Sequence, residues 1–299
     1  MTTHLPFLLT GVSGQLGRLV ADQLLQDTVR APVIGTSRTP ERLGDLAARG
    51  LLVRCADFDE PEGLPIAFAG ADRLLLISTG AIHAGPRRVA QHRAALQACA
   101  QAGVRHVAYT SFLEADSSPL TALAADHAAT EAMLEQGPTG YTVLRHAFYM
   151  EMLLSTLPRA IATGRLLSVS GHAGVAYVTR ADCAIADAAA MRDGFLGRRR
   201  LDITGPSALT SAQLVECVNA VLGTAIVHVE ASRAELEAHY AAGGMPLPMA
   251  RMLAALDEGL GQGAMARSSD DFEALTGRTA CDVDEFLRMH REVLLRRQA

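Results

Sequence analysis

The chain contains no lysine, because all 27 of its basic side chains are arginine. This absence excludes Schiff-base catalysis, the phosphate-binding lysine of Walker-type nucleotidases and a Tyr-x-x-x-Lys proton-transfer pair. The five cysteines include no Cys-x-x-Cys pair, and the ten histidines show no His-Glu-x-x-His or other close ligand spacing. We therefore expect reduced cysteines that serve packing, and no bound metal.

Strong charge and long apolar runs are also missing. The net charge of −5 and the sequence pI near 6.1 give no general attraction to nucleic acid phosphates. The compact basic run Arg198-Arg199-Arg200 is expected to be a solvated turn before a strand at 201–204. No basic segment precedes the first short apolar run, and no apolar stretch is long enough to cross a bilayer. We expect a cytoplasmic protein with no nucleic-acid or membrane partner.

A glycine-rich turn follows the first apolar run, residues 5–9. Residues 10–17 read Thr-Gly-Val-Ser-Gly-Gln-Leu-Gly, and apolar residues at helical spacing come next. Glycines permit close backbone approach, and the following helix N-terminus directs unpaired N–H groups and its positive dipole at phosphates. With a second strand expected at 32–36, this order predicts dinucleotide binding, a merely structural turn being the alternative. The predicted contacts are Gly11, Ser13, Gly14, Gln15, Leu16 and Gly17.

Strand-like and helix-like segments alternate through the first half of the chain. Strands are expected at 5–9, 32–36, 51–55, 73–77, 106–109 and 141–145, and helices near 40–49, 62–68, 86–102 and 121–136. This alternation predicts an α/β fold, a Rossmann-like doubly wound parallel sheet with right-handed crossovers. We assign residues 1–152 to the dinucleotide-binding domain. Residues 153–299 are assigned to a smaller α+β lobe that caps the substrate, with some segments returning to the main sheet.

The end of the expected second strand bears on the choice of cofactor. Proteins that prefer NAD usually place Asp or Glu there, whereas this chain has Ser37-Arg38. Arg38, with Arg42 one helical turn on, would meet the 2′-phosphate of NADPH, and a plain surface arginine is the alternative. The ends of the third and fourth strands supply further expected contacts, although Asp and Ser also serve in ordinary turns. These contacts are Asp57, Phe58, Ser78 and Thr79.

Further motifs are spread along nearly the whole chain. They lie at residues 10–17, 37–40, 56–58, 74–78, 108–111, 125–131, 141–145, 179–182 and 275–278. In these motifs the chain resembles the NmrA-like atypical short-chain dehydrogenases, and most closely their quinone-reducing and triphenylmethane-dye-reducing bacterial members. These relatives also lack the tyrosine and lysine pair, so the missing lysine agrees with the resemblance. The motif at 108–111 adds Tyr109, Thr110 and Ser111 to the expected cofactor contacts.

The resemblance implies an NADPH-dependent oxidoreductase that transfers hydride to a quinone or a similar conjugated electrophile. Hydride transfer to such an acceptor needs little general acid catalysis. The main contribution expected of the protein is therefore to position the acceptor against the cofactor. One alternative is a non-catalytic NADP(H)-binding redox sensor that regulates a protein partner, which the absent catalytic pair suits equally well. Another is a reductase of cationic dyes or imines. The oligomeric state is left open between monomer and homodimer.

Three side chains are candidates for the acceptor site. His127 falls on the inward stripe of its helix, where Glu131 one turn later could orient it, and it is a candidate donor to the acceptor oxygen. His146, where the relatives usually have Asn, and Tyr149 follow the sixth strand and are candidates for the same cleft. All three are equally interpretable as core residues. Residues 243–249 form a candidate lid or a plain surface loop.

Overall fold

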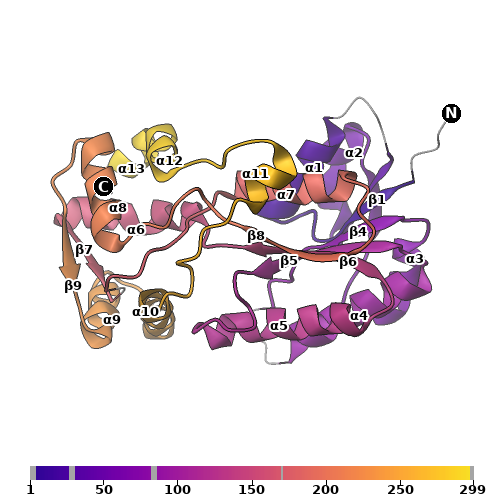
Figure 1. Ribbon diagram of the computed structural model, residues 1–299, viewed down its shortest axis with the longest axis horizontal. Coiled ribbons are helices and arrows are strands. Elements are labelled where there is room, and N and C mark those ends of the chain that lie inside the picture. Colours follow the sequence, from indigo (N-terminus) through magenta and orange to yellow (C-terminus); the bar gives the residue numbers. More distant parts are fainter. Residues whose placement is uncertain (1–4, 27–30, 82–85, 170, 297–299) are drawn as a thin grey trace.

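The computed structural model describes residues 5–26, 31–81, 86–169 and 171–296. Seven parallel strands form one sheet in the order β3-β2-β1-β4-β5-β6-β8 (Figure 1). They are β1 (Phe7–Leu9), β2 (Val33–Ser37), β3 (Leu52–Cys55), β4 (Arg73–Leu76), β5 (His106–Phe112), β6 (Gly140–His146) and β8 (Arg198–Ile203). Because the strand order reverses between β1 and β4, the sheet is doubly wound, and the predicted fold class is confirmed.

Helices cover both faces of this sheet (Figure 1). One face carries α1 (Gln15–Leu25), η1 (Pro40–Leu43), α2 (Gly44–Ala48), α7 (Arg180–Arg192) and α11 (Asp271–Thr276). The other carries η2 (Pro61–Gly63), α3 (Leu64–Phe68), α4 (Arg87–Gln101) and α5 (Thr121–Gln136). Successive strand residues alternate between two buried clusters, as Leu8 and Leu9 of β1 do. Burial on both faces explains why the strands are continuous apolar runs.

The second half of the chain builds a smaller lobe beyond the end of β6 (Figure 1). It contains η3 (Met150–Met152), α6 (Leu153–Thr163), β7 (Arg165–Ser168), α8 (Ser211–Leu222), β9 (Val227–Glu230), α9 (Arg233–Ala242), α10 (Leu247–Gly261), α12 (Val283–Met289) and α13 (Arg291–Leu295). Strands β7 and β9 pair in parallel as a second sheet. Helix α7 and strand β8 return to the main sheet. The division at residue 152 stays a prediction.

Two local predictions are wrong. Residues 198–200 were expected in a solvated turn, but they form the first half of β8. The first of these arginines donates to the carbonyl of Gly137 at 2.6 Å, and the third donates to the carboxylate of Glu131 at 3.1 Å. The second half of the expected loop 243–249 is helical, because α10 begins at Leu247.

Helix length and thiol burial bear on two further expectations. Among the residues described, no helix is long and apolar enough to cross a membrane. All five cysteines are free thiols, and Cys99 and Cys183 lie in the core. Those two therefore pack as expected, whereas Cys55 is exposed.

Candidate active site

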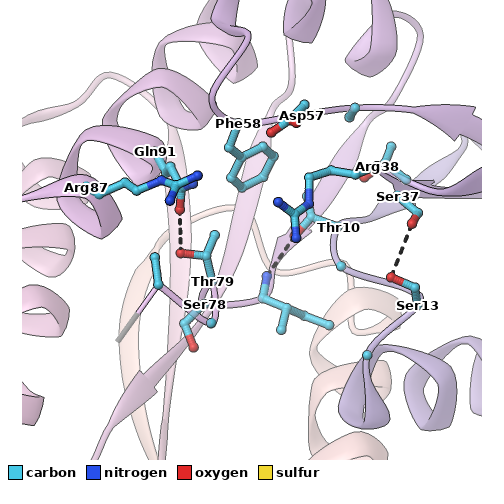
Figure 2. Close-up of a pocket in the computed structure, with 17 residues that line it drawn as sticks. Thr10, Ser13, Ser37, Arg38, Asp57, Phe58, Ser78, Thr79, Arg87 and Gln91 are labelled. Atoms are coloured by element: carbon cyan, nitrogen blue, oxygen red, sulfur yellow. Dashed lines mark hydrogen bonds between the residues drawn. The ribbon is translucent and has the colours of Figure 1, made fainter. Parts of the chain in front are cut away.

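A cavity of about 490 Å³ lies at the carboxyl ends of β1, β2, β3 and β4. The glycine turn and Arg38 line one side, and the first turns of α4 line the opposite side (Figure 2). Eight predicted cofactor contacts belong to the lining: Gly11, Ser13, Gly14, Arg38, Asp57, Phe58, Ser78 and Thr79. Thr10 and Gly80, from the same predicted turns, also line it, and the sequence interpretation missed Thr36, Ser37, Ala56, Ile77, Ala81, Arg87 and Gln91.

The glycine turn allows a phosphate to approach the backbone closely. Gly11 has a φ of +62°, in the left-handed region that favours glycine. A Cβ atom on Gly17 would lie 2.4 Å from the carbonyl oxygen of Gly11, so only glycine lets α1 pack this closely. Gly14 caps α1 without a side chain, and the first turn of the helix carries no acidic residue. The free N–H groups and the helix dipole therefore suit a pyrophosphate.

Six predicted cofactor contacts lie outside this lining, namely Gln15, Leu16, Gly17, Tyr109, Thr110 and Ser111. Gln15 is exposed at the start of α1, whereas Leu16 lies in the core. The hydroxyl of Thr110 accepts the backbone N–H of Ser78 at 2.9 Å. This bond supports the end of β4 from the neighbouring strand, so Thr110 positions a lining residue. Direct contact between these six residues and a cofactor stays a prediction.

The end of β2 forms a cationic corner of the cavity. The Ser37 hydroxyl donates to the Ser13 hydroxyl at 3.1 Å and thereby ties β2 to the glycine turn. Arg38 is exposed, and no described residue forms a hydrogen bond or ion pair with its guanidinium. No carboxylate stands at the end of β2, and Arg42 is exposed outside the lining. This donor set fits the 2′-phosphate of NADPH better than a free ribose hydroxyl.

Helix α4 forms the wall opposite Arg38 (Figure 2). Arg87 pairs with Asp59 at 2.5 Å, and the Gln91 amide donates to the same carboxylate at 2.9 Å. These hydrogen bonds, that from Arg87 first, lower the pKa of Asp59 to about 2. The Thr79 hydroxyl donates to Gln91 at 2.8 Å, which joins the end of β4 to this wall. The four-residue spacing of Arg87 and Gln91, at the start of the helix that follows the fourth strand, was the signal available in the sequence.

His127 of α5 is held against β5 by Tyr109. The Tyr109 hydroxyl lies 2.9 Å from Nδ1, and the Phe112 ring stacks on the imidazole at 5.9 Å. Burial lowers the pKa of His127 well below its ordinary value and raises the pKa of Tyr109, so both side chains are neutral. The neutral imidazole and the phenol share this hydrogen bond, and its direction depends on which ring nitrogen carries the proton. No described residue forms a hydrogen bond with Nε2 of His127, and His127 is in the lining of neither the 490 Å³ cavity nor the cavity of the smaller lobe.

Glu131 does not orient His127, which corrects the sequence interpretation. Its carboxylate accepts a hydrogen bond from Ser111 at 2.6 Å and two from Arg145, at 2.6 and 3.0 Å. Arg200 donates to the same carboxylate at 3.1 Å. Glu131 is therefore the centre of a buried network that joins α5 to β5, β6 and β8.

His146 and Tyr149 lie together, and the hydrogen bonds of His146 go to Tyr149 and Asp187 and not to His127. His146 Nε2 is 3.0 Å from the carboxylate of Asp187 in α7, and its Nδ1 is 3.2 Å from the Tyr149 hydroxyl. The guanidinium of Arg180 lies over the Tyr149 ring, 4.6 Å from its centre. Neither predicted residue lines the 490 Å³ cavity. Their catalytic assignment stays a prediction, and the contacts observed are those of a buried polar cluster.

A second cavity, of about 190 Å³, lies in the smaller lobe between α6, β7, α9 and α10. Its walls are mostly apolar, and Phe148 and Met152, which follow β6, contribute to them. Met245, from the segment predicted as a lid, also lines it. Burial raises the pKa of Asp257 in its wall to about 6, although the carboxylate accepts the backbone N–H of Val169. An apolar space beside the carboxyl edge of the sheet suits a flat conjugated molecule.

Comparison with known proteins agrees with this geometry. The sequence profile of the NAD(P)H-binding family matches residues 11–193. Quinone oxidoreductase 2 of Escherichia coli is 34% identical over 277 residues, which cover 93% of this chain and 96% of that protein. The structure of the E. coli NADPH-dependent quinone oxidoreductase QOR2 with NADPH superposes with a TM-score of 0.88, at 33% identity, covering 95% of this chain and 99% of that one. The structure of Citrobacter sp. triphenylmethane reductase complexed with NADP(H) also superposes with a TM-score of 0.88. Its sequence identity is 30%, and the match covers 95% of this chain and 99% of that one.

Proposed function

Because the chain belongs to the NAD(P)H-binding, NmrA-like family of oxidoreductases, we propose that it reduces quinones with NADPH. Bound NADPH supplies the hydride, and the quinone takes up this hydride and one proton from water to become a hydroquinone. The observation that carries the proposal is the 490 Å³ cavity, which has on one side the glycine turn and Arg38, an arginine that no described residue pairs. The quinone oxidoreductase relatives, alike over nearly the whole chain, support the same reaction.

The chain's own residues divide into those for the cofactor and those for the acceptor. Gly11 and Gly14 would hold the pyrophosphate against the start of α1, and Arg38 would bind the 2′-phosphate. Thr79, fixed by Gln91, would contact the cofactor farther along the same edge of the sheet. His127, in the tautomer with its proton on Nε2, would donate to the acceptor oxygen and hold the acceptor in a reactive orientation.

The apolar cavity of the smaller lobe would receive the rest of the acceptor. It begins at Phe148 and Met152, directly after β6, so the lobe places apolar surface next to the carboxyl edge of the sheet. Exclusion of water by such a surface strengthens the electrostatic effect of nearby donors. We place the reaction in the cytoplasm, since five free thiols suit a reducing compartment, with a small-molecule acceptor as the partner.

The test is NADPH oxidation, followed by absorbance, with the purified protein and a simple 1,4-quinone. Quinones oxidise NADPH slowly by themselves, so the rate with heat-denatured protein is subtracted. We expect saturable oxidation that depends on the folded protein and is much slower with NADH. Tight NADPH binding without turnover of quinones would contradict the proposal and favour a sensor.

A further inference from the structure

Asp257 of α10 is a carboxylate in the wall of the mostly apolar cavity in the smaller lobe. Its Oδ2 accepts the backbone N–H of Val169, which directly follows β7. Its Oδ1 forms no hydrogen bond or ion pair with any residue that the structure describes, and neither phenol of the lining, Tyr177 or Tyr240, donates to it. Oδ1 is also not one of the fully buried polar atoms that lack a partner, so its surface is open to a small molecule.

Two arginines line the same cavity, but neither forms an ion pair with Asp257. Arg159 donates through Nε to Nε2 of His239 at 3.1 Å, and it also donates to the carbonyl of His239 at 2.9 Å. Arg165 is exposed to solvent. Burial, and after it the nearby carboxylate of Glu230, raise the pKa of Asp257 to about 6. A carboxylate in these surroundings gains from a hydrogen-bond donor on a bound molecule.

The cavity has lining residues both near the main sheet and on the far side of the smaller lobe. Phe148 and Met152 follow β6 of the main sheet. Asp257 binds next to the end of β7, and β7 and β9 lie on the side of the lobe away from the main sheet (Figure 1). A cavity of about 150 Å³ holds benzene, so this cavity of about 190 Å³ has room for one substituted ring. An acceptor whose reacting ring lies at the edge of the sheet would direct its other end at Asp257.

We propose that Asp257 selects acceptors that carry a hydroxyl or amino group on the ring away from the reacting quinone ring. This inference rests on the proposed function, because it names the substrate class of the same acceptor site. The donor group binds Oδ1, and the hydride and the proton from water enter the quinone ring as before. An apolar analogue fills the same space but leaves the carboxylate unpaired. Sites that hydrogen-bond a donor of the substrate discriminate strongly against such analogues.

The experiment uses two quinones that differ in one hydrogen-bond donor. They are 6-amino-1,4-naphthoquinone and 6-methyl-1,4-naphthoquinone, whose substituents have similar sizes. NADPH oxidation is followed at about pH 8, where a carboxyl group with a pKa of about 6 is ionised. The amino group makes the quinone less electrophilic, so the quantity compared between proteins is the ratio of kcat/KM for the amino compound to kcat/KM for the methyl compound.

We expect Asp257→Asn to lower this ratio at least about tenfold, because a hydrogen bond to a charged group contributes this much. The loss should appear mainly in KM for the amino compound, since the contact is distant from the reacting ring. Asparagine has the shape of aspartate, and its carbonyl can still accept the N–H of Val169. Glu258→Gln is the matched control, because Glu258 is the next carboxylate of α10, binds Arg233 and lies outside the cavity lining. Its ratio should equal that of the wild type.

Two outcomes of the kinetic assay would overturn the inference. An unchanged ratio in Asp257→Asn, with quinone turnover in the wild type, would exclude Asp257 from acceptor selection and leave the proposed function intact. Equal lowering of the ratio in Asp257→Asn and Glu258→Gln would assign the effect to α10 as a whole and not to the cavity.

A binding measurement tests Asp257 without turnover. If the wild type oxidises NADPH with neither quinone, the proposed function fails, and the binding of the two compounds then decides the role of Asp257. Each compound is dialysed to equilibrium against protein saturated with NADP⁺ and measured by its absorbance. We expect the wild type to bind the amino compound more tightly than the methyl compound, and Asp257→Asn to reverse this order. A wild type that binds the methyl compound equally or more tightly would overturn the inference, and this comparison requires no variant.

Discussion

Replacing Arg38 with alanine should remove the preference for NADPH while leaving the affinity for NADH nearly unchanged. In the structure Arg38 lines the cavity, is exposed, and has no partner among the described residues, so the substitution breaks no contact of the folded chain. A hydrogen bond to a charged group contributes about 1.5–3 kcal/mol, and exposure favours the lower half of that range. We therefore expect a loss of about 2 kcal/mol, or roughly thirtyfold weaker NADPH binding.

Titration of both cofactors by calorimetry measures this change directly. Arg42→Ala is the matched control, because Arg42 is also exposed and lies four residues farther on, outside the cavity lining. The Arg38 effect should shrink as salt is added, since a solvent-exposed charge pair is screened, whereas NADH binding should respond little. Equal weakening of NADPH and NADH, or equal effects of the two arginines, would refute the assignment of Arg38 to the 2′-phosphate.

Three further changes test other parts of the site. Gly17→Ala should lower both the Tm and NADPH affinity, because the new Cβ would lie 2.4 Å from the carbonyl of Gly11; an unchanged melting curve would show that the turn can adjust. His127→Ala should lower kcat for quinones about a hundredfold without weakening NADPH binding, and, because burial holds the wild-type imidazole neutral, kcat/KM should show no histidine inflection between about pH 6 and 8. Burial raises the pKa of Asp257 from 3.8 to about 6, so the folded state binds this proton more tightly than the unfolded state does. Stability should therefore fall by up to about 3 kcal/mol as pH rises from about 4 to 6, and urea titrations of Asp257→Asn should lack this fall.

Much of the main sheet could be predicted because its signals are local. The helix expected at 121–136 has those bounds in the structure, and the strand expected at 32–36 is β2, Val33–Ser37. In both cases an apolar pattern is bounded by residues that favour turns, so neighbours in sequence decide the element. The glycine turn could be located for the same reason, since its geometry depends on residues within one turn of each other.

Partner choice could not be predicted, because it depends on residues far apart in the sequence. Helical spacing placed Glu131 one turn from His127. The carboxylate of Glu131 instead binds Arg200, which is 69 residues farther along the chain, in the strand that pairs with β6. The same return of β8 explains why residues 198–200 are not a solvated turn. Spacing along a helix tells which face a residue occupies. It does not tell which side chains from other segments pack against that face.

The adjacent residues Arg87 and Arg88 show how strongly distant contacts decide the surroundings of a side chain in a protein that has arginine and no lysine. One residue step rotates a side chain by about 100° around a helix, so the two face different surroundings. Arg87 is exposed and held by Asp59, whereas Arg88 is buried with no described partner. In the sequence the two residues are adjacent and identical, and only their contacts in the folded structure distinguish them. The pairing of Arg87 depends on Asp59, which lies 28 residues away in the sequence and was not part of the helical pattern. Which of two adjacent arginines is paired is therefore decided by contacts between distant segments and not by the helix that both residues share.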